Sequence, residues 1–157
     1  NTPGTSLALS EDKIRAYKNF ANKLWNIARF VLSSTEGEKL EKNFSAWSEK
    51  DALLKKEFTD VLTDITSDME NLRLYLSAEK LYHYAWHTFA DIILEDSKKI
   101  LKEGNVEEIR SRKQFLLYTL GALLTALHPF TPFVTEEIWK DIPIDGKKML
   151  IVEKWPI

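Results

Sequence analysis

Apolar residues recur at helical spacing through four long segments of this chain, and this periodicity limits its fold more than any other feature. In the first segment, about residues 12–32, they follow the i, i+3, i+4, i+7 spacing of one helix face. The apolar positions there are Ile14, Tyr17, Ala21, Leu24, Trp25, Ala28, Val31 and Leu32. Similar stripes predict helices over about residues 49–72, 78–103 and 107–128. The expected fold class is all-α, an antiparallel bundle of four long helices plus a short C-terminal helix.

Residues with known preferences for helix ends stand at the borders of these segments. Ser48 and Ser77 are the expected N-caps of the second and third helices, and Gly104 is expected to end the third. His128-Pro-Phe-Thr-Pro132 ends the fourth, because proline cannot continue the hydrogen-bond ladder of a helix. The second of these prolines suits the first position of the short helix, which should reach about Asp141.

The length and composition fit one globular domain. The chain has 157 residues, which is long enough to form a hydrophobic core. Of these residues 44% are hydrophobic and 29% are charged, as in globular proteins. We expect an irregular lead-in at residues 1–10 and an irregular or strand-like tail at residues 143–157. No apolar run is long enough to cross a membrane, no signal peptide begins the chain and cysteine is absent, so a cytoplasmic protein is expected. Because the first residue is asparagine rather than methionine, we also expect a piece of a longer protein.

One row of side chains on the first helix is unusual for a solvent-facing surface. Asn19, Lys23, Asn26 and Phe30 share this row, roughly opposite the apolar face of a helix with 3.6 residues per turn. Five basic residues and no acidic residue lie within residues 13–33, in a chain whose net charge is −2. These basic residues are Lys13, Arg15, Lys18, Lys23 and Arg29. We predict that they form the strongest positive patch of the domain, with the second helix contributing the opposing acidic surface.

Three interpretations of this row remain open from the residues alone. In the first, the helix is central in the bundle and buries both faces, so that Ile27 and Phe30 belong to the core. In the second, the row binds nucleic acid, because aromatic rings stack on unpaired bases, amides read base edges and lysine attracts phosphate. In the third, the bundle is a protein–protein interaction module with a groove beside this helix.

The third helix carries the clearest candidate for a metal site. Glu79, His83, His87 and Asp91 recur every four residues, and two histidines at that spacing on one helix can bind zinc. The run lacks the glutamate of a zincin helix and the Glu-x-x-His pair of di-iron bundles, so we predict no metal and interpret the row as polar surface. No nucleophile–base pair and no Gly-rich phosphate loop stands out, so we expect no catalytic residues.

Other side chains are expected to have structural roles. The second helix carries seven acidic and three basic residues, which is typical of a solvated outer face. Trp25, Trp86 and Trp139 are expected to anchor the core. Glu95 and Lys98 are expected to form a surface ion pair that contributes little to stability.

Four segments, in order, resemble the anticodon-binding domain of class I aminoacyl-tRNA synthetases. They are Asn19-Phe-Ala-Asn-Lys-Leu-Trp-Asn-Ile-Ala-Arg-Phe-Val31, Ala78-Glu-Lys-Leu-Tyr-His-Tyr-Ala-Trp-His-Thr-Phe-Ala-Asp91 followed by Leu94-Glu95, Leu116-Leu-Tyr-Thr-Leu120, and His128-Pro-Phe-Thr-Pro-Phe-Val-Thr-Glu-Glu-Ile-Trp139. The isoleucyl and leucyl enzymes share the His-Pro-Phe and Glu-Glu-Ile-Trp features of the last segment. The run Asn22-Lys-Leu-Trp-Asn26 is more typical of the valyl enzyme. Ile92 and Ile93 depart from the Trp-Tyr pair that the family often has.

The resemblance implies a helical bundle that docks the anticodon stem-loop of a tRNA, here tRNA-Val, and performs no chemistry and needs no cofactor itself. Aminoacylation would belong to a separate catalytic domain that uses ATP and Mg²⁺, whose His-x-Gly-His and Lys-Met-Ser-Lys-Ser signatures do not occur in this chain. The valyl family reads anticodon bases partly with a lysine and an aromatic residue, which match Lys23 and Phe30. With their neighbours, the expected tRNA anticodon-binding residues are Lys23, Phe30, Asn26, Arg29 and Asn19. The anticodon-binding domain of an isoleucyl or leucyl enzyme is the alternative.

Overall fold

The computed structural model of the chain describes residues 11–156, with the backbone alone at residues 12–14. Its elements, in chain order, are α1 (Glu11–Ser34), α2 (Glu49–Glu70), α3 (Leu74–His83), η1 (Tyr84–Leu94), α4 (Glu95–Glu103), α5 (Val106–Leu127), α6 (Pro132–Trp139) and η2 (Leu150–Val152). η1 is a π-helix and η2 is a single 3-10 turn, and the described part of the chain contains no strand. The predicted all-α fold class is confirmed. None of these helices combines the length and the apolar character that a membrane span requires.

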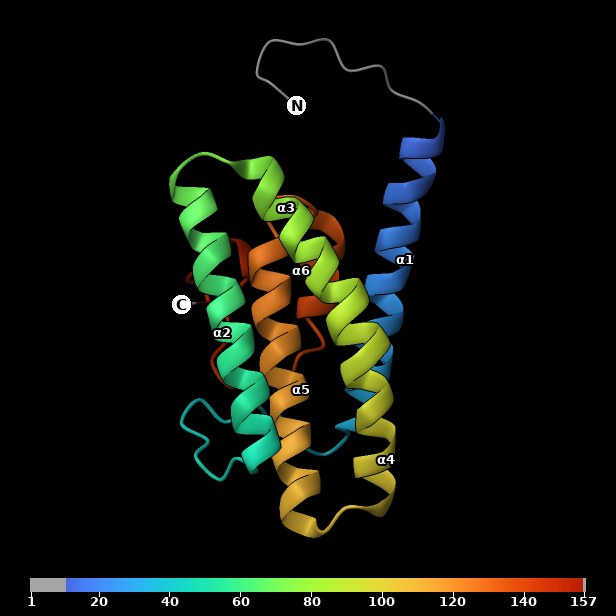
Figure 1. Ribbon diagram of the computed structural model, residues 1–157, viewed down its shortest axis with the longest axis vertical. Coiled ribbons are helices and arrows are strands. Elements are labelled where there is room, and N and C mark those ends of the chain that lie inside the picture. Colours follow the sequence, from blue (N-terminus) through green and yellow to red (C-terminus); the bar gives the residue numbers. More distant parts are fainter. Residues whose placement is uncertain (1–10, 157) are drawn as a thin grey trace.

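The helices pack as an antiparallel bundle around α5. Figure 1 shows α2 turning back into α3 at one end of the molecule and α4 turning back into α5 at the other end. α3, η1 and α4 follow one another without a break and form one long rod. α5 contacts α1, α2, α3, α4 and α6, and most of its 22 residues are buried. The central helix is therefore α5, whereas α1 lies at the outside of the bundle with much of its surface exposed.

Local sequence signals set the starts of two helices. The Ser48 hydroxyl accepts a hydrogen bond from the backbone N–H of Asp51 at 3.2 Å and caps α2 as predicted. Asn105 and Glu108 begin α5 with a reciprocal capping box, in which each side chain accepts from the backbone N–H of the other residue at 2.9 Å. These bonds satisfy N–H groups that a helix leaves unpaired in its first turn, so they fix where the two helices begin.

The start of α3 and the tail differ from the prediction. α3 begins at Leu74, and Ser77 lies inside it, fully buried. The Ser77 hydroxyl donates to the carbonyl oxygen of Arg73 at 3.4 Å, one turn earlier, instead of capping the helix. A serine can bond its own helix in this way, so its presence alone does not mark a helix start. In the tail, residues 150–152 form the 3-10 turn η2 rather than a strand-like stretch.

The buried face of α1 is rotated from the predicted one. The buried apolar residues of α1 are Phe20, Leu24, Ile27, Ala28 and Val31. Tyr17 is 71% exposed although its spacing puts it on the predicted apolar face. Trp25 is 37% exposed, so the prediction that it anchors the core is wrong. Of the other two predicted anchors, Trp139 is buried and Trp86 is half-buried. An outer helix buries a narrower stripe than its sequence offers, and the residues at the edge of that stripe stay exposed.

A buried ionic network joins α2, α4 and α5. The Arg112 guanidinium on α5 is fully buried and donates to Asp51 at 2.7 Å and to Asp96 at 2.8 Å. It also donates to the Ser97 hydroxyl at 3.0 Å, and the Ser111 hydroxyl donates to Asp51 at 2.6 Å. A buried guanidinium without such partners would destabilise the fold strongly, so these contacts restrict how the three helices can meet.

Two acidic residues of α2 do not belong to a solvated face. Asp51 and Asp68 are 1% and 2% exposed, so the prediction that α2 turns its acids outward is wrong for both. Asp68 accepts hydrogen bonds from Lys80 at 2.6 Å and from Arg73 at 2.8 Å. These hydrogen bonds, first that from Lys80 and then that from Arg73, hold the pKa of Asp68 below its ordinary value. Part of the acidic charge of α2 is thus used to bind α3.

Candidate nucleic-acid interface

A groove between α1 and the η1 and α4 part of the rod brings together three of the five predicted binding residues. Its volume is about 220 Å³. The residues that line it are Lys23, Asn26, Ile27 and Phe30 from α1, with Ala90, Leu94, Glu95 and Lys98 from the rod. Lys23, Asn26 and Phe30 follow one another at helical spacing along one side of α1. The groove therefore presents an ammonium, an amide and an aromatic ring next to one another.

Phe30 lies at the border between the core and the groove. Its ring is half-buried and packs against the core, whereas Ile27 is 2% exposed and belongs to the core itself. The Lys98 ammonium lies 5.9 Å from the centroid of the Phe30 ring, within the range of a cation–π contact. The core interpretation thus holds for Ile27. Phe30 lies in two environments, because part of its ring packs against the core and part of it lines the groove.

Lys23 is paired within the protein. Its ammonium is 2.9 Å from one carboxylate oxygen of Asp91 and 5.1 Å from the centroid of the Trp86 ring. The hydrogen bond from Lys23 holds the pKa of Asp91 below its ordinary value. The other carboxylate oxygen of Asp91 lies 3.5 Å from Nδ1 of His87. Lys23 is therefore positioned at the groove by two partners, and Asp91 offsets its positive charge.

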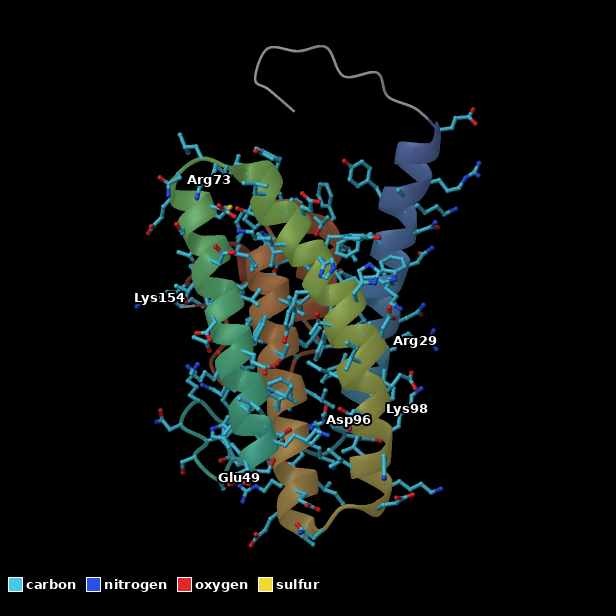
Figure 2. All side chains as sticks on the ribbon, in the orientation of Figure 1. Arg29, Glu49, Arg73, Asp96, Lys98 and Lys154 are labelled. Carbon is cyan, nitrogen blue, oxygen red and sulfur yellow. The ribbon has the colours of Figure 1, made fainter. Side chains whose placement is uncertain are left out.

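The two remaining predicted residues do not line the groove. Asn19 and Arg29 are both exposed on α1. Figure 2 shows Arg29 projecting from α1 on the same side of the molecule as Lys98 of α4. Arg29 thus lies outside the groove, beside Phe30 on α1. Asn19 stands one turn before Lys23 and extends the polar row along α1.

The positive patch of α1 rests on fewer charges than the sequence indicates. Arg15, Lys18 and Arg29 are exposed, and they form no ion pair with the residues whose side chains the structure describes. The charge of Lys23 is offset inside the groove. The side chain of Lys13 lies outside the described residues. That these charges form the strongest positive patch of the domain stays a prediction.

The histidine row of the third predicted helix lies at the surface of the rod. His83 and His87 are exposed, and their ring centroids are 5.0 Å apart. Among the side chains that the structure describes, no group of three or more His, Cys, Asp or Glu residues is arranged to hold a metal ion. The sequence-based prediction of no metal here remains a prediction.

Sequence reasoning missed the second wall of the groove. Glu95 and Lys98 form the predicted ion pair, with 2.6 Å between nitrogen and oxygen, but both residues also line the groove. The π-helix η1 separates α4 from α3, and its i to i+5 hydrogen bonds change which residues of the rod come to face α1. No pattern in the sequence indicates this change, so the role of α4 could not be read from periodicity.

A larger hollow beside the first half of α1 has a different character. Its volume is about 430 Å³. The lining residues are Ala16, Tyr17, Phe20, Ala78, Tyr82, Leu127, Phe130 and Thr131. The ring centroids of Phe20 and Tyr82 are 5.1 Å apart, and among the side chains that the structure describes none that lines the hollow is charged or an amide. The polar groups of its described lining are the hydroxyls of Tyr17, Tyr82 and Thr131, without a cation or an amide. The groove between α1 and α4 adds an ammonium and an amide to an aromatic ring, so it is the better candidate for nucleic acid.

Comparison with known proteins defines the class of this domain. Residues 51–157, more than half of the chain, match the family model described as the anticodon-binding domain of tRNA ligase. The chain belongs to this family, and its helical bundle is an anticodon-binding domain. The matched region begins in α2, so α1 and its candidate binding row lie before it.

The individual relatives identify a narrower group of proteins than the family model does, and their alignments include α1. The valine–tRNA ligase of Pelagibacter ubique is 34% identical over 164 aligned residues, which cover 99% of this chain and 18% of that protein. The valine–tRNA ligases of Xanthomonas oryzae pv. oryzae and Stenotrophomonas maltophilia are each 36% identical over 141 residues, 90% of this chain and 14% and 15% of those proteins. The chain is thus similar to a segment of valine–tRNA ligases and spans less than a fifth of the length of these relatives.

Proposed function

We propose that this domain binds the anticodon stem-loop of a tRNA, and that its tRNA is tRNA-Val. The observation that carries the proposal is the groove in which Lys23, Asn26 and Phe30 converge. The family of the domain and its similarity to valine–tRNA ligases support the choice of RNA.

The groove offers the chemistry that unpaired bases require. The bases of an anticodon loop expose both their faces and their edges to side chains. Phe30 provides a ring on which a base can stack, and the Asn26 amide can both donate and accept hydrogen bonds at a base edge. Lys23 provides a donor that Asp91 and Trp86 hold in place. Because Asp91 offsets the charge of Lys23, we assign Lys23 to a base edge rather than to a phosphate.

The phosphate contacts are assigned to exposed basic residues of α1. Arg29 stands next to the groove, and Arg15 and Lys18 continue along the helix. Each phosphate contact on a single strand contributes about −0.7 to the slope of log K against log salt concentration. If all three residues bind phosphate, a slope of about −2 is expected.

The wider function is proposed for the larger enzyme of which this domain would be a part. A separate catalytic domain would join valine to tRNA with ATP and Mg²⁺ in the cytoplasm. The present domain would select the tRNA by its anticodon, and none of its residues is assigned to the chemistry.

A titration tests the proposal. Fluorescently labelled anticodon stem-loops of tRNA-Val, tRNA-Ile and tRNA-Leu, matched in their stems, are titrated with the chain at about 50 and 200 mM salt. The valine stem-loop should bind most tightly, and its affinity should fall as the salt concentration rises. Equal or tighter binding of the isoleucine or leucine stem-loop would overturn the assignment to valine. Failure of all three to bind at the lower salt concentration would overturn anticodon recognition by this chain.

A further inference from the structure

The α4 wall of the groove carries a charged pair beside Phe30. The Lys98 ammonium lies 2.6 Å from a carboxylate oxygen of Glu95 and 5.9 Å from the centroid of the Phe30 ring. The side chains of Lys98 and Glu95 are 54% and 61% exposed, so both can move without disturbing the core. In Figure 2, Lys98 projects from α4 on the side from which Arg29 of α1 also projects.

The Lys98 ammonium lies over the Phe30 ring, in space that a stacked base would need. Phe30 is half-buried and packs against the core, so only the part of its ring that lines the groove is open to a ligand. An ammonium and a base cannot occupy the same ring surface, and a base that stacks on Phe30 must therefore displace Lys98. Base stacking on an aromatic ring is stronger than an exposed cation–π contact, which favours the exchange.

We propose that Lys98 is a tRNA-binding residue that leaves the Phe30 ring and binds the phosphate of the nucleotide whose base takes its place. This inference rests on the proposed function of the groove. The flexible four-carbon stem of lysine lets the ammonium move while α4 stays in place. Glu95 is the anion that Lys98 leaves behind. Its carboxylate lies in the same groove, so it repels the incoming phosphate and lowers the affinity.

The size of the groove limits the contact to one nucleotide. Its volume of about 220 Å³ lies below the roughly 300–1,000 Å³ of pockets that hold drug-sized ligands. One flat base beside Phe30, with Asn26 at its edge, suits this space better than a stack of several bases. α4 thereby joins α1 as an element that contacts the anticodon loop.

Charge-removing variants of α4 test the exchange. Lys98→Met keeps most of the aliphatic stem and removes the charge. We expect the affinity for the labelled valine anticodon stem-loop to fall about two- to fivefold, the range of one exposed charge pair. The magnitude of the salt slope should shrink by about 0.7, the value of one phosphate contact on a single strand. Glu95→Gln should raise the affinity by a similar factor. Lys99→Met is the matched control, because Lys99 follows on the same helix but does not line the groove, and it should change both quantities less.

An NMR readout follows the Lys98 side chain directly. In the free chain, the protons next to the Lys98 ammonium should show a ring-current shift from Phe30, and saturating stem-loop should remove it. If the wild-type chain binds RNA, any one of the following results shows that the inference is wrong while the proposed function stands. Lys98→Met keeps the wild-type affinity and salt slope, or it loses no more than Lys99→Met, or the ring-current shift persists in the complex. Absence of binding by the wild-type chain would overturn both.

Discussion

Replacing Phe30 tests whether one ring serves both the fold and the binding of RNA. In a fully buried site, Phe→Ala lowers the free energy of unfolding by about 3–5 kcal/mol. Because Phe30 is half-buried, we expect Phe30→Ala to lower it by about half as much, roughly 1.5–2.5 kcal/mol. Loss of one base stack should weaken stem-loop binding by about 1–3 kcal/mol, which corresponds to roughly 5–150-fold in Kd.

Two further variants separate the loss of stability from the loss of binding. Phe30→Leu keeps an apolar side chain but removes the ring, so it should cost less stability than Phe30→Ala and still lose the stacking. Leu24→Ala removes a fully buried side chain of the same helix that does not line the groove. It should lower the free energy of unfolding by about 2–5 kcal/mol and leave the affinity of the folded fraction unchanged.

Denaturant unfolding and stem-loop titration on the same preparations measure both effects. The assignment of Phe30 is supported if Phe30→Leu loses binding while Leu24→Ala keeps it. It is refuted if Phe30→Ala and Phe30→Leu both bind the stem-loop like the wild type under conditions in which they are folded. In that case the ring stacks on no base and serves only the fold.

The remaining predictions concern stability. Arg112→Ala leaves the buried Asp51 without its cationic partner and should lower the free energy of unfolding in denaturant by about 3–5 kcal/mol, whereas a loss below about 1 kcal/mol would contradict the network. The hydrogen bond from Lys80 lowers the pKa of Asp68 in the folded state. The stability that this pairing contributes is therefore fully present above the unfolded pKa of 3.8 and is lost as the pH falls through the lowered folded pKa. In Asp68→Asn, the free energy of unfolding should therefore depend less steeply on pH in the acidic range. An unchanged pH dependence in that range would refute this. Leu72 has a φ of 57° and is 83% exposed, so Leu72→Gly relieves left-handed strain. It should raise the free energy of unfolding by about 0.5–1 kcal/mol, and a lower melting temperature would count against it.

The parts of the fold that depend on local signals could be predicted from the sequence. The first helix, predicted over about 12–32, is found at Glu11–Ser34, and the helix predicted over about 107–128 is found at Val106–Leu127. The Ser48 cap was predictable because its partner is a backbone N–H only three residues away. Apolar periodicity and capping are contained within a few turns of chain, so no knowledge of distant segments is needed.

The features that sequence reasoning missed depend on distant partners. Lys23 meets Asp91, which is 68 residues away, so nothing in the first helix indicates that its charge is offset. Arg112 is buried because Asp51, 61 residues away, neutralises it inside the bundle. Lys98 lines the groove because the rod that contains η1 packs against α1. Charged side chains are surface residues by default, and only tertiary partners identify the exceptions.

The most direct test of the central claim is an NMR titration of the isotope-labelled chain with the anticodon stem-loop of tRNA-Val. The largest shift changes should fall at the Asn26 side-chain amide, the Phe30 ring and Lys98, on both sides of the groove between α1 and α4. The apolar hollow around Tyr17 and Phe20 should change little. Shift changes concentrated at that hollow or on α2, with the groove unchanged, would contradict the assignment of this groove as the tRNA-binding site.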